Sequence, residues 1–174
     1  MKPVIYTIGH STHTIDEFIK ILHTYNIEEV IDIRTIPKSR HNPQFNIDKL
    51  KDSLLASNIY YKQMKGLGGF RHTSPASINM AWENEAFRGF ADYMQTNEFE
   101  KSLLELINIS RTKQVVIMCA EAVPWHCHRS LIGDALLVRN IYIEDIMNEK
   151  VSRPHKLTSF AKVDGKVITY PGEI

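Results

Sequence analysis

Four short segments rich in β-branched residues constrain the fold of this chain more than any other feature. They are VIYTI (4–8), EVIDI (29–33), VVIMC (115–119) and IYIEDI (141–146), and three of them are almost continuously apolar. Strands of this kind are typically buried on both faces, as in a parallel sheet covered by helices. The segments therefore predict the central sheet of an α/β domain.

Helical patterns lie between these segments. Thr14, followed three residues later by Glu17, forms a capping box at the start of a segment with one apolar face, residues 14–25. Asn46 is expected to cap a second helix that continues to about Ser57, and residues 87–94, 99–109 and 130–138 show further helical spacing. The alternation predicts one three-layer α/β domain over residues 1–174, with a mainly parallel sheet.

Two further segments depart from the alternation. Residues 162–170 (KVDGKVITY) predict a hairpin that turns at Asp164 and Gly165. Residues 62–82 contain Gly66, Gly68, Gly69 and Pro75, and read as one long loop. Loops of this length in compact domains usually serve a site, so we expect this loop to cover one.

Composition limits the classes of function. Lys and Arg number 21 against 20 Asp and Glu, which gives a net charge of +1 and no global attraction to DNA or to an anionic membrane. A site for an anion must therefore be local. The sequence contains no apolar run long enough to span a membrane and no signal peptide, so we expect a cytoplasmic protein whose two cysteines stay as thiols.

Polar residues gather where the predicted strands end. GHSTH (9–13), RTIPKSRHNPQF (34–45) and CAEAVPWHCHRS (119–130) each follow a strand. Ligands of open parallel sheets bind at the carboxyl ends of the strands, so we expect these segments to form one polar site. Its candidate catalytic residues are His10, Glu121, Cys127 and His128. Its candidate anion-binding residues are Ser11, Arg34, Arg40, Arg71, Arg129 and Ser130.

The start of the predicted helix at 130–138 favours an anion. Its backbone N–H groups and its dipole would act beside Arg129, and phosphate is the leading ligand class. Cys127 in the same place should have a depressed pKa, which would suit a nucleophile. Only one residue separates Cys127 from Arg129, and nine separate Cys119 from Arg129, whereas cysteine phosphatase and sulfur-transfer loops keep five.

Structural roles compete with these readings. Arg129 can pair with Glu121 or Asp134, and the histidines can cap turns. Cys119 suits a small buried hydrophobic residue, and Asp32 an internal hydrogen bond. Phe70 and Trp125 can stack on a ligand or anchor the core.

Cofactor signatures are weak. The histidines and cysteines lack the spacing of a zinc site, and the glycine loop lacks both the dinucleotide fingerprint and the P-loop ending. No metal site is predicted from spacing, and a catalytic metal on dispersed ligands, with Glu121 or Asp32 as a carboxylate ligand, stays an open alternative. The cofactor and the oligomeric state stay unassigned.

Five motifs, TIGHST (7–12), IDIRTIPKSR (31–40), GLGGFR (66–71), MCAEAVPWHCHRS (118–130) and PHKLTSFA (154–161), resemble the domain of unknown function 488, DUF488. The resemblance spans almost the whole chain. It implies an α/β domain without an established reaction. It also implies that the family's pattern falls on His10, Ser11, Arg34, Arg40, Cys119, Glu121, Cys127, His128 and Arg129.

Two classes of function follow from the residues. The first is an enzyme that acts on a phosphate-bearing substrate, with nucleic acid as one such substrate. The alternative is a binding module for nucleic acid or a nucleotide without turnover. A carboxylate and thiols are not needed to bind an anion, so Glu121 and Cys127 favour the enzyme.

Overall fold

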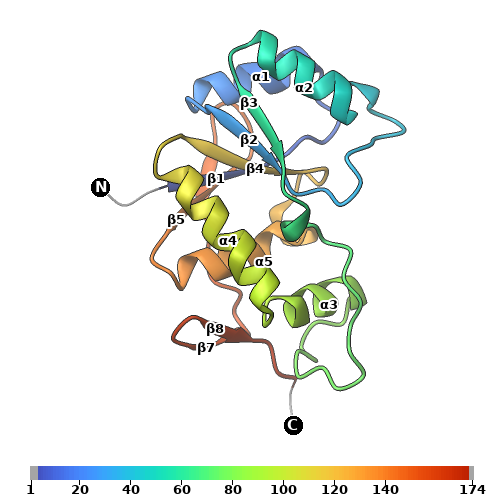
Figure 1. The fold of residues 1–174 in the computed structure, drawn as a ribbon, viewed down its shortest axis with the longest axis vertical. Helices are drawn as coiled ribbons and strands as arrows, with labels where there is room; N and C mark the ends of the chain where they lie inside the picture. The colour runs from blue at the N-terminus through green and yellow to red at the C-terminus, as the bar shows by residue number, and fades with distance from the viewer. Residues whose placement is uncertain (1–3, 173–174) are drawn as a thin grey trace.

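A six-stranded sheet forms the centre of the computed structural model, which describes residues 4–172 (Figure 1). The strands lie in the order β3-β2-β4-β1-β5-β6. All neighbours are parallel except β5 and β6, which are antiparallel. The predicted α/β class with a mainly parallel sheet is confirmed. The strand bounds are β1 Val4–Gly9, β2 Glu29–Asp32, β3 Tyr60–Gln63, β4 Val115–Cys119, β5 Tyr142–Ile146 and β6 Ser152–Pro154.

Helices cover both faces of this sheet (Figure 1). One apolar cluster joins α1 and α2 to strand residues such as Val30 and Val116. A second cluster joins α3, α4 and α5 to the opposite strand positions, among them Ile31 and Ile117. The helix bounds are α1 Ile15–Thr24, α2 Ile47–Ala56, α3 Glu85–Tyr93, α4 Asn97–Ser110 and α5 Arg129–Leu137. The alternation of strand side chains between the two clusters produces three layers.

Local signals account for the helix starts. The Thr14 hydroxyl accepts a hydrogen bond from the backbone N–H of Glu17 at 3.1 Å, as a helix cap does. The Glu17 carboxylate lies 3.3 Å from His13 Nδ1. Asn46 stands at the predicted cap position of α2, but its side chain accepts from the Ser39 N–H at 2.7 Å and does not cap the helix.

The sequence patterns missed two edge strands. β3 begins at Tyr60, in a polar segment whose side chains are exposed or half-buried, and its last two residues fall in the predicted loop 62–82. β6 is only three residues long and contains Pro154, which has low strand propensity. The predicted hairpin is confirmed: β7 (Lys162–Asp164) pairs with β8 (Val167–Thr169), and Gly165 has a φ of 62°.

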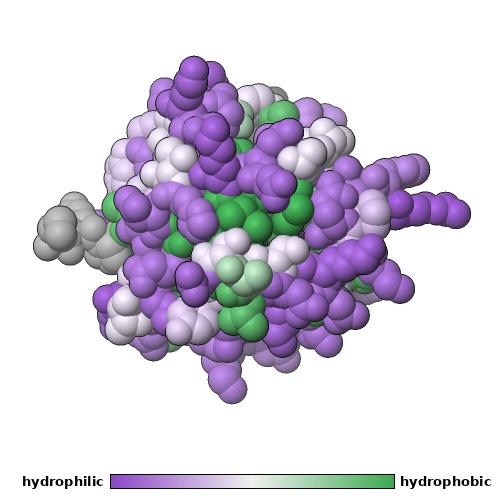
Figure 2. Space-filling view, turned by 90° about the horizontal axis from the view of Figure 1, so that it is seen from above, coloured by the Kyte–Doolittle hydropathy of each residue, from purple (hydrophilic) through white to green (hydrophobic). Residues whose placement is uncertain are grey.

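The outer face over α1 and α2 is mostly hydrophilic, with a small apolar area near its centre (Figure 2). These helices therefore turn their polar sides to solvent. Within residues 4–172, every helix is too short or too polar to cross a lipid bilayer.

Candidate functional site

The segments after β1 and β4 lie directly against each other. The N–H groups of His10 and Ser11 donate to the carbonyls of Cys119 and Ala120, at 2.9 and 3.0 Å. The approach is so close that a Cβ atom at Gly9 would lie 1.7 Å from the Glu121 carbonyl oxygen. The expected convergence of these two strand exits is therefore present, and it requires glycine at this position.

A cavity of about 320 Å³ opens at this edge of the sheet. We call it the thiol cavity. It contains four of the ten candidate site residues, Arg34, Glu121, Cys127 and His128. The full lining is Arg34, Thr35, Ile36, Lys38, Gly69, Phe70, Ala86, Phe87, Cys119, Ala120, Glu121, His126, Cys127 and His128.

Cys127 and His128 form a hydrogen-bonded pair at the start of α5. His128 Nδ1 lies 3.6 Å from the Cys127 sulfur, and its Nε2 lies 2.9 Å from the Leu67 carbonyl oxygen. Because a carbonyl only accepts, Nε2 carries a proton and Nδ1 is the nitrogen that faces the sulfur. This is the arrangement of a nucleophile, its base and the group that orients the base.

The surroundings of Cys127 favour its thiolate. A hydrogen bond from the Cys119 thiol, together with His128 and the Arg129 backbone N–H, lowers the pKa of Cys127 to about 4 despite burial. Burial raises the pKa of Cys119. At neutral pH the two sulfurs therefore share one negative charge, which lies at the positive end of α5.

Arg129 supplies a buried positive charge beside the sulfurs. The residue is 1 % exposed and donates from Nη2 to the Ala122 carbonyl at 3.0 Å. Its Nε and Nη1 have no hydrogen-bond partner within residues 4–172. The guanidinium acts to lower the pKa of Cys119. Within residues 4–172 neither Glu121 nor Asp134, the two predicted partners, forms an ion pair with Arg129, and Asp134 binds His155 and Tyr170 instead. We infer that the shared thiolate balances the charge of Arg129.

Arg34 lines the cavity, but its guanidinium is held in a buried ion pair with Asp32. It donates to Asp32 from Nε at 2.9 Å and from Nη2 at 2.7 Å, and both residues are buried. Tyr61 donates to the same carboxylate at 2.5 Å. The internal hydrogen bonding expected of Asp32 is therefore present. Only Nη1, which lies 3.4 Å from His10 Nε2, stays outside the ion pair.

His10 and Ser11 support the site from behind and do not line the cavity. His10 is 2 % exposed and stacks on Phe45 at 4.2 Å, and its Nδ1 lies 2.9 Å from the Ser11 carbonyl. Burial lowers the pKa of His10 to about 4, so it is neutral at pH 7. Ser11 has a φ of 48°, which shapes the turn after β1.

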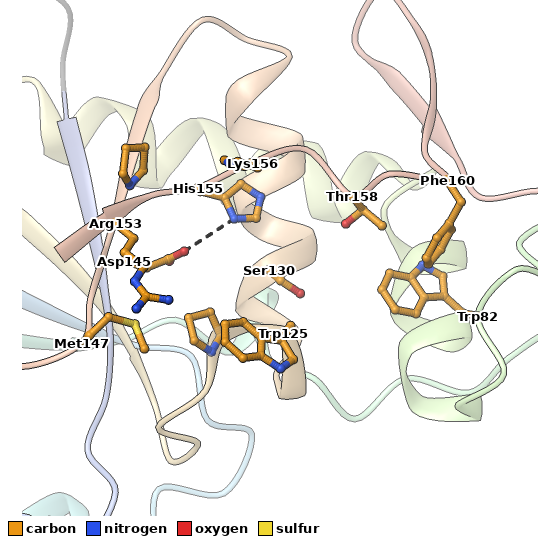
Figure 3. A pocket seen from close by; sticks show the side chains of 12 residues that line it. Trp82, Trp125, Ser130, Asp145, Met147, Arg153, His155, Lys156, Thr158 and Phe160 are labelled. Carbon is orange, nitrogen blue, oxygen red and sulfur yellow. Dashed lines mark ion pairs between the residues drawn. The ribbon is translucent and has the colours of Figure 1, made fainter. Parts of the chain in front are cut away.

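Three other candidate anion-binding residues lie elsewhere. Arg40 is exposed in the segment after β2. Arg71 donates to the carbonyls of Lys65 and Gly68 and lies 3.6 Å above the Tyr93 ring, so it braces the glycine loop. Ser130 donates to the Cys127 carbonyl at 2.9 Å and lines a second cavity (Figure 3).

Sequence patterns did not identify the residues that orient His128. Besides the Leu67 carbonyl, Gly69 is required, because a Cβ atom there would lie 2.7 Å from His128 Nδ1. Both residues belong to the glycine-rich loop that was expected to cover a site. Within residues 4–172 no three His, Cys, Asp or Glu side chains are grouped to hold a metal ion.

The fold and the site define an α/β domain with a cysteine–histidine pair at the carboxyl edge of a parallel sheet. Residues 14–136 match the family described as Domain of unknown function DUF488. The match covers most of the chain, so this protein belongs to the DUF488 family. Comparison with curated proteins and with solved structures gave no significant match.

Proposed function

We propose that this protein is an enzyme that uses Cys127 as a nucleophile on a phosphate-bearing substrate. The observation that carries the proposal is the pair formed by the Cys127 sulfur and His128 Nδ1 at 3.6 Å, with Nε2 held by the Leu67 carbonyl. A binding module needs neither a thiolate nor an oriented base. The position of both side chains on the wall of an open cavity supports turnover.

The first step would be a displacement at an electrophilic atom of the substrate. The Cys127 sulfur forms a bond to that atom, and the bond to the leaving group breaks. The leaving group keeps the bonding electrons and takes from His128 the proton that the thiol gave up. Arg129 and the Arg129 N–H stabilise the thiolate before attack.

The second step would release the product. Glu121 is an exposed carboxylate on the cavity wall, where it can take a proton from water. The water oxygen then bonds to the transferred group, and the sulfur leaves as thiolate. This assigns Glu121 a role as general base. Glu121 then releases its proton to solvent and His128 takes one up from solvent, which returns the pair to its starting state.

Positive charge at the cavity supports the phosphate-bearing substrate class. Lys38 is exposed on the wall, and the buried Arg34, which is ion-paired with Asp32, lines the same space. A phosphate bound there would lie near Lys38 and Arg34, and neither of these cations is needed to stabilise the Cys127 thiolate. The phosphate serves in this proposal as the group that is recognised.

Turnover and covalent trapping test the proposal together. The wild-type protein would be incubated with phosphate monoesters, phosphodiesters, nucleotides and short oligonucleotides, followed by product analysis and intact-protein mass spectrometry. We expect product formation that Cys127→Ser abolishes and that His128→Gln lowers about 100-fold or more. His41→Gln, an exposed histidine outside the cavity, should keep wild-type activity.

Two outcomes would contradict the enzyme. Equal turnover by wild type and Cys127→Ser would show that Cys127 is not the nucleophile. Binding of the probes with neither product nor an adduct on Cys127 would make the protein a binding module.

A further inference from the structure

The second cavity lies beside the thiol cavity and has a different chemistry. Its volume is about 660 Å³, which is in the range of small-molecule sites. It is bounded by Trp82 and Phe160 on one side, by Trp125 on another, and by His155 and Thr158 on a third (Figure 3). Neither the family match nor the proposed reaction assigns a ligand to it.

We propose that this cavity binds the base of a nucleotide, free or within a single nucleic-acid strand, and that Arg153 and Lys156 bind its phosphate. The inference names the substrate class of the proposed enzyme. It rests on the proposed function only in that respect, because base binding does not require the thiol.

Aromatic surface in the cavity matches the face of a base. Trp125 is 60 % exposed and Phe160 is 41 % exposed, although both are large apolar side chains. Trp82 is held rigidly by edge-on contacts with Phe160 at 4.9 Å and with Tyr170 at 5.5 Å. Exposed, fixed aromatic rings are the usual platforms on which bases stack.

The charges around the cavity favour an anionic ligand. Arg153 and Lys156 are exposed on its wall, and neither forms an ion pair within the described part of the chain. The one carboxylate on the wall, Asp145, already binds Thr7 and lies 3.7 Å from His155 Nδ1 (Figure 3). A phosphate therefore meets two available cations and a carboxylate that is already neutralised.

Basic residues extend from the cavity along the chain. The segment 150–166 contains one acidic residue, Asp164, against Lys150, Arg153, Lys156, Lys162 and Lys166. The whole chain has a net charge of only +1, so positive charge is concentrated in this segment. Such a segment can bind the phosphate backbone of a nucleic-acid strand beyond the nucleotide whose base lies in the cavity.

Direct hydrogen bonds connect the two cavities. The Ser130 hydroxyl lines the second cavity and donates to the Cys127 carbonyl at 2.9 Å. The Cys127 N–H donates to the carbonyl of Pro124, which lines the second cavity, at 3.1 Å. Only residues 124–130 would therefore separate a base stacked on Trp125 from the Cys127 thiolate. Binding of the base could in this way position the substrate for attack.

Intrinsic fluorescence tests the proposal directly, because the chain has two tryptophans and both line this cavity. The purified full chain would be titrated with AMP, UMP, ribose 5-phosphate, and single- and double-stranded oligonucleotides of DNA and RNA. We expect quenching by the nucleotides and single strands, and little by ribose 5-phosphate. If oligonucleotides bind more tightly than AMP, the base belongs to a nucleic-acid strand. If they bind equally, the ligand is a free nucleotide.

Variants locate the binding. Trp125→Leu, at an exposed position that the fold does not need, should weaken binding about ten-fold or more. Binding by this variant is followed with a dye-labelled ligand. Arg153→Gln combined with Lys156→Gln should weaken binding and reduce its dependence on salt. Tyr60→Leu, an exposed aromatic residue on β3, is the matched control and should bind like wild type.

Three results would overturn the base site: no binding of any base-containing probe, equal quenching by ribose 5-phosphate, or an unchanged affinity in Trp125→Leu. Cys127→Ser separates this proposal from the enzyme. It should bind the nucleotide like wild type, and turnover that needs Cys127 but not Trp125 would reject the base site alone.

Discussion

The carbonyl oxygen of Glu121 occupies the space that a side chain at Gly9 would need. A Cβ atom there would lie 1.7 Å from that oxygen, and the obstacle is backbone. We expect Gly9→Ala to destabilise the protein by about 1–3 kcal/mol or more, because the segment after β4 must shift. Gly165→Asn, in an open turn with a φ of 62°, should stay within about 0.5 kcal/mol of wild type. Urea unfolding of both variants measures the difference, and equal midpoints would contradict the close approach.

The shared thiolate has a spectroscopic signature. We expect the ultraviolet absorbance of a thiolate to persist in wild type as the pH falls, and to disappear near pH 4. Cys127→Ser should remove it. Cys119→Ala removes the hydrogen bond that most lowers the pKa of Cys127, so the transition should move toward the ordinary value of 9. A thiolate that is absent from wild type at neutral pH would reject the assignment of Cys127 as nucleophile.

Arg34 and Arg40 should respond differently to the same substitution. Arg34→Gln breaks a buried ion pair and leaves the Asp32 carboxylate without its cation, so we expect a loss of about 3–5 kcal/mol. Arg34→Lys should recover only part of this, because an ammonium group cannot donate to both carboxylate oxygens as a guanidinium does. Arg40→Gln, at an exposed position, should change stability by less than about 0.5 kcal/mol. Thermal unfolding of the three variants would distinguish this pattern from two equivalent surface arginines.

His155 makes stability depend on pH in the alkaline range. Burial alone would lower the pKa of His155, but Asp134 and Asp145 raise it to about 9 from the ordinary value of 6.5. A raised pKa in the folded state gives stability that is complete below 6.5 and is lost as the pH rises through 9. The difference corresponds to about 3 kcal/mol. Urea midpoints at about pH 6 and about pH 9.5 should show this loss in wild type and a flatter profile in His155→Gln. A wild-type profile as flat as that of the variant would argue against the charged pair.

Patterns of local origin were predictable from the sequence. The buried strands, the Thr14 cap and the Gly165 turn depend on neighbouring residues, and all three are present. The position of Cys127 at the start of α5 was also predictable, because it follows from the helix boundary.

The direction in which each arginine points was not predictable. Arg34, Arg40 and Arg71 all follow strands or lie in loops, yet one binds Asp32, one is exposed and one donates to backbone carbonyls. These outcomes depend on partners that pack next to the arginines only after folding, such as Tyr93 beneath Arg71. The second cavity was missed for the same reason, because Trp82, Trp125 and His155 come from three distant parts of the chain.

Asp134 fastens the C-terminal segment to α5. One carboxylate oxygen accepts from His155 Nε2 at 2.9 Å and from the Thr158 N–H at 3.0 Å, and the other accepts from the Tyr170 hydroxyl at 2.8 Å. Three points of the segment therefore depend on one buried side chain, so residues 155–170 should open and close as a single cooperative unit. His155, Lys156, Thr158 and Phe160 on the wall of the second cavity belong to this segment, so that wall would be incomplete in an open form. Occupancy of that cavity and protection of the segment's amides from hydrogen exchange must consequently rise together.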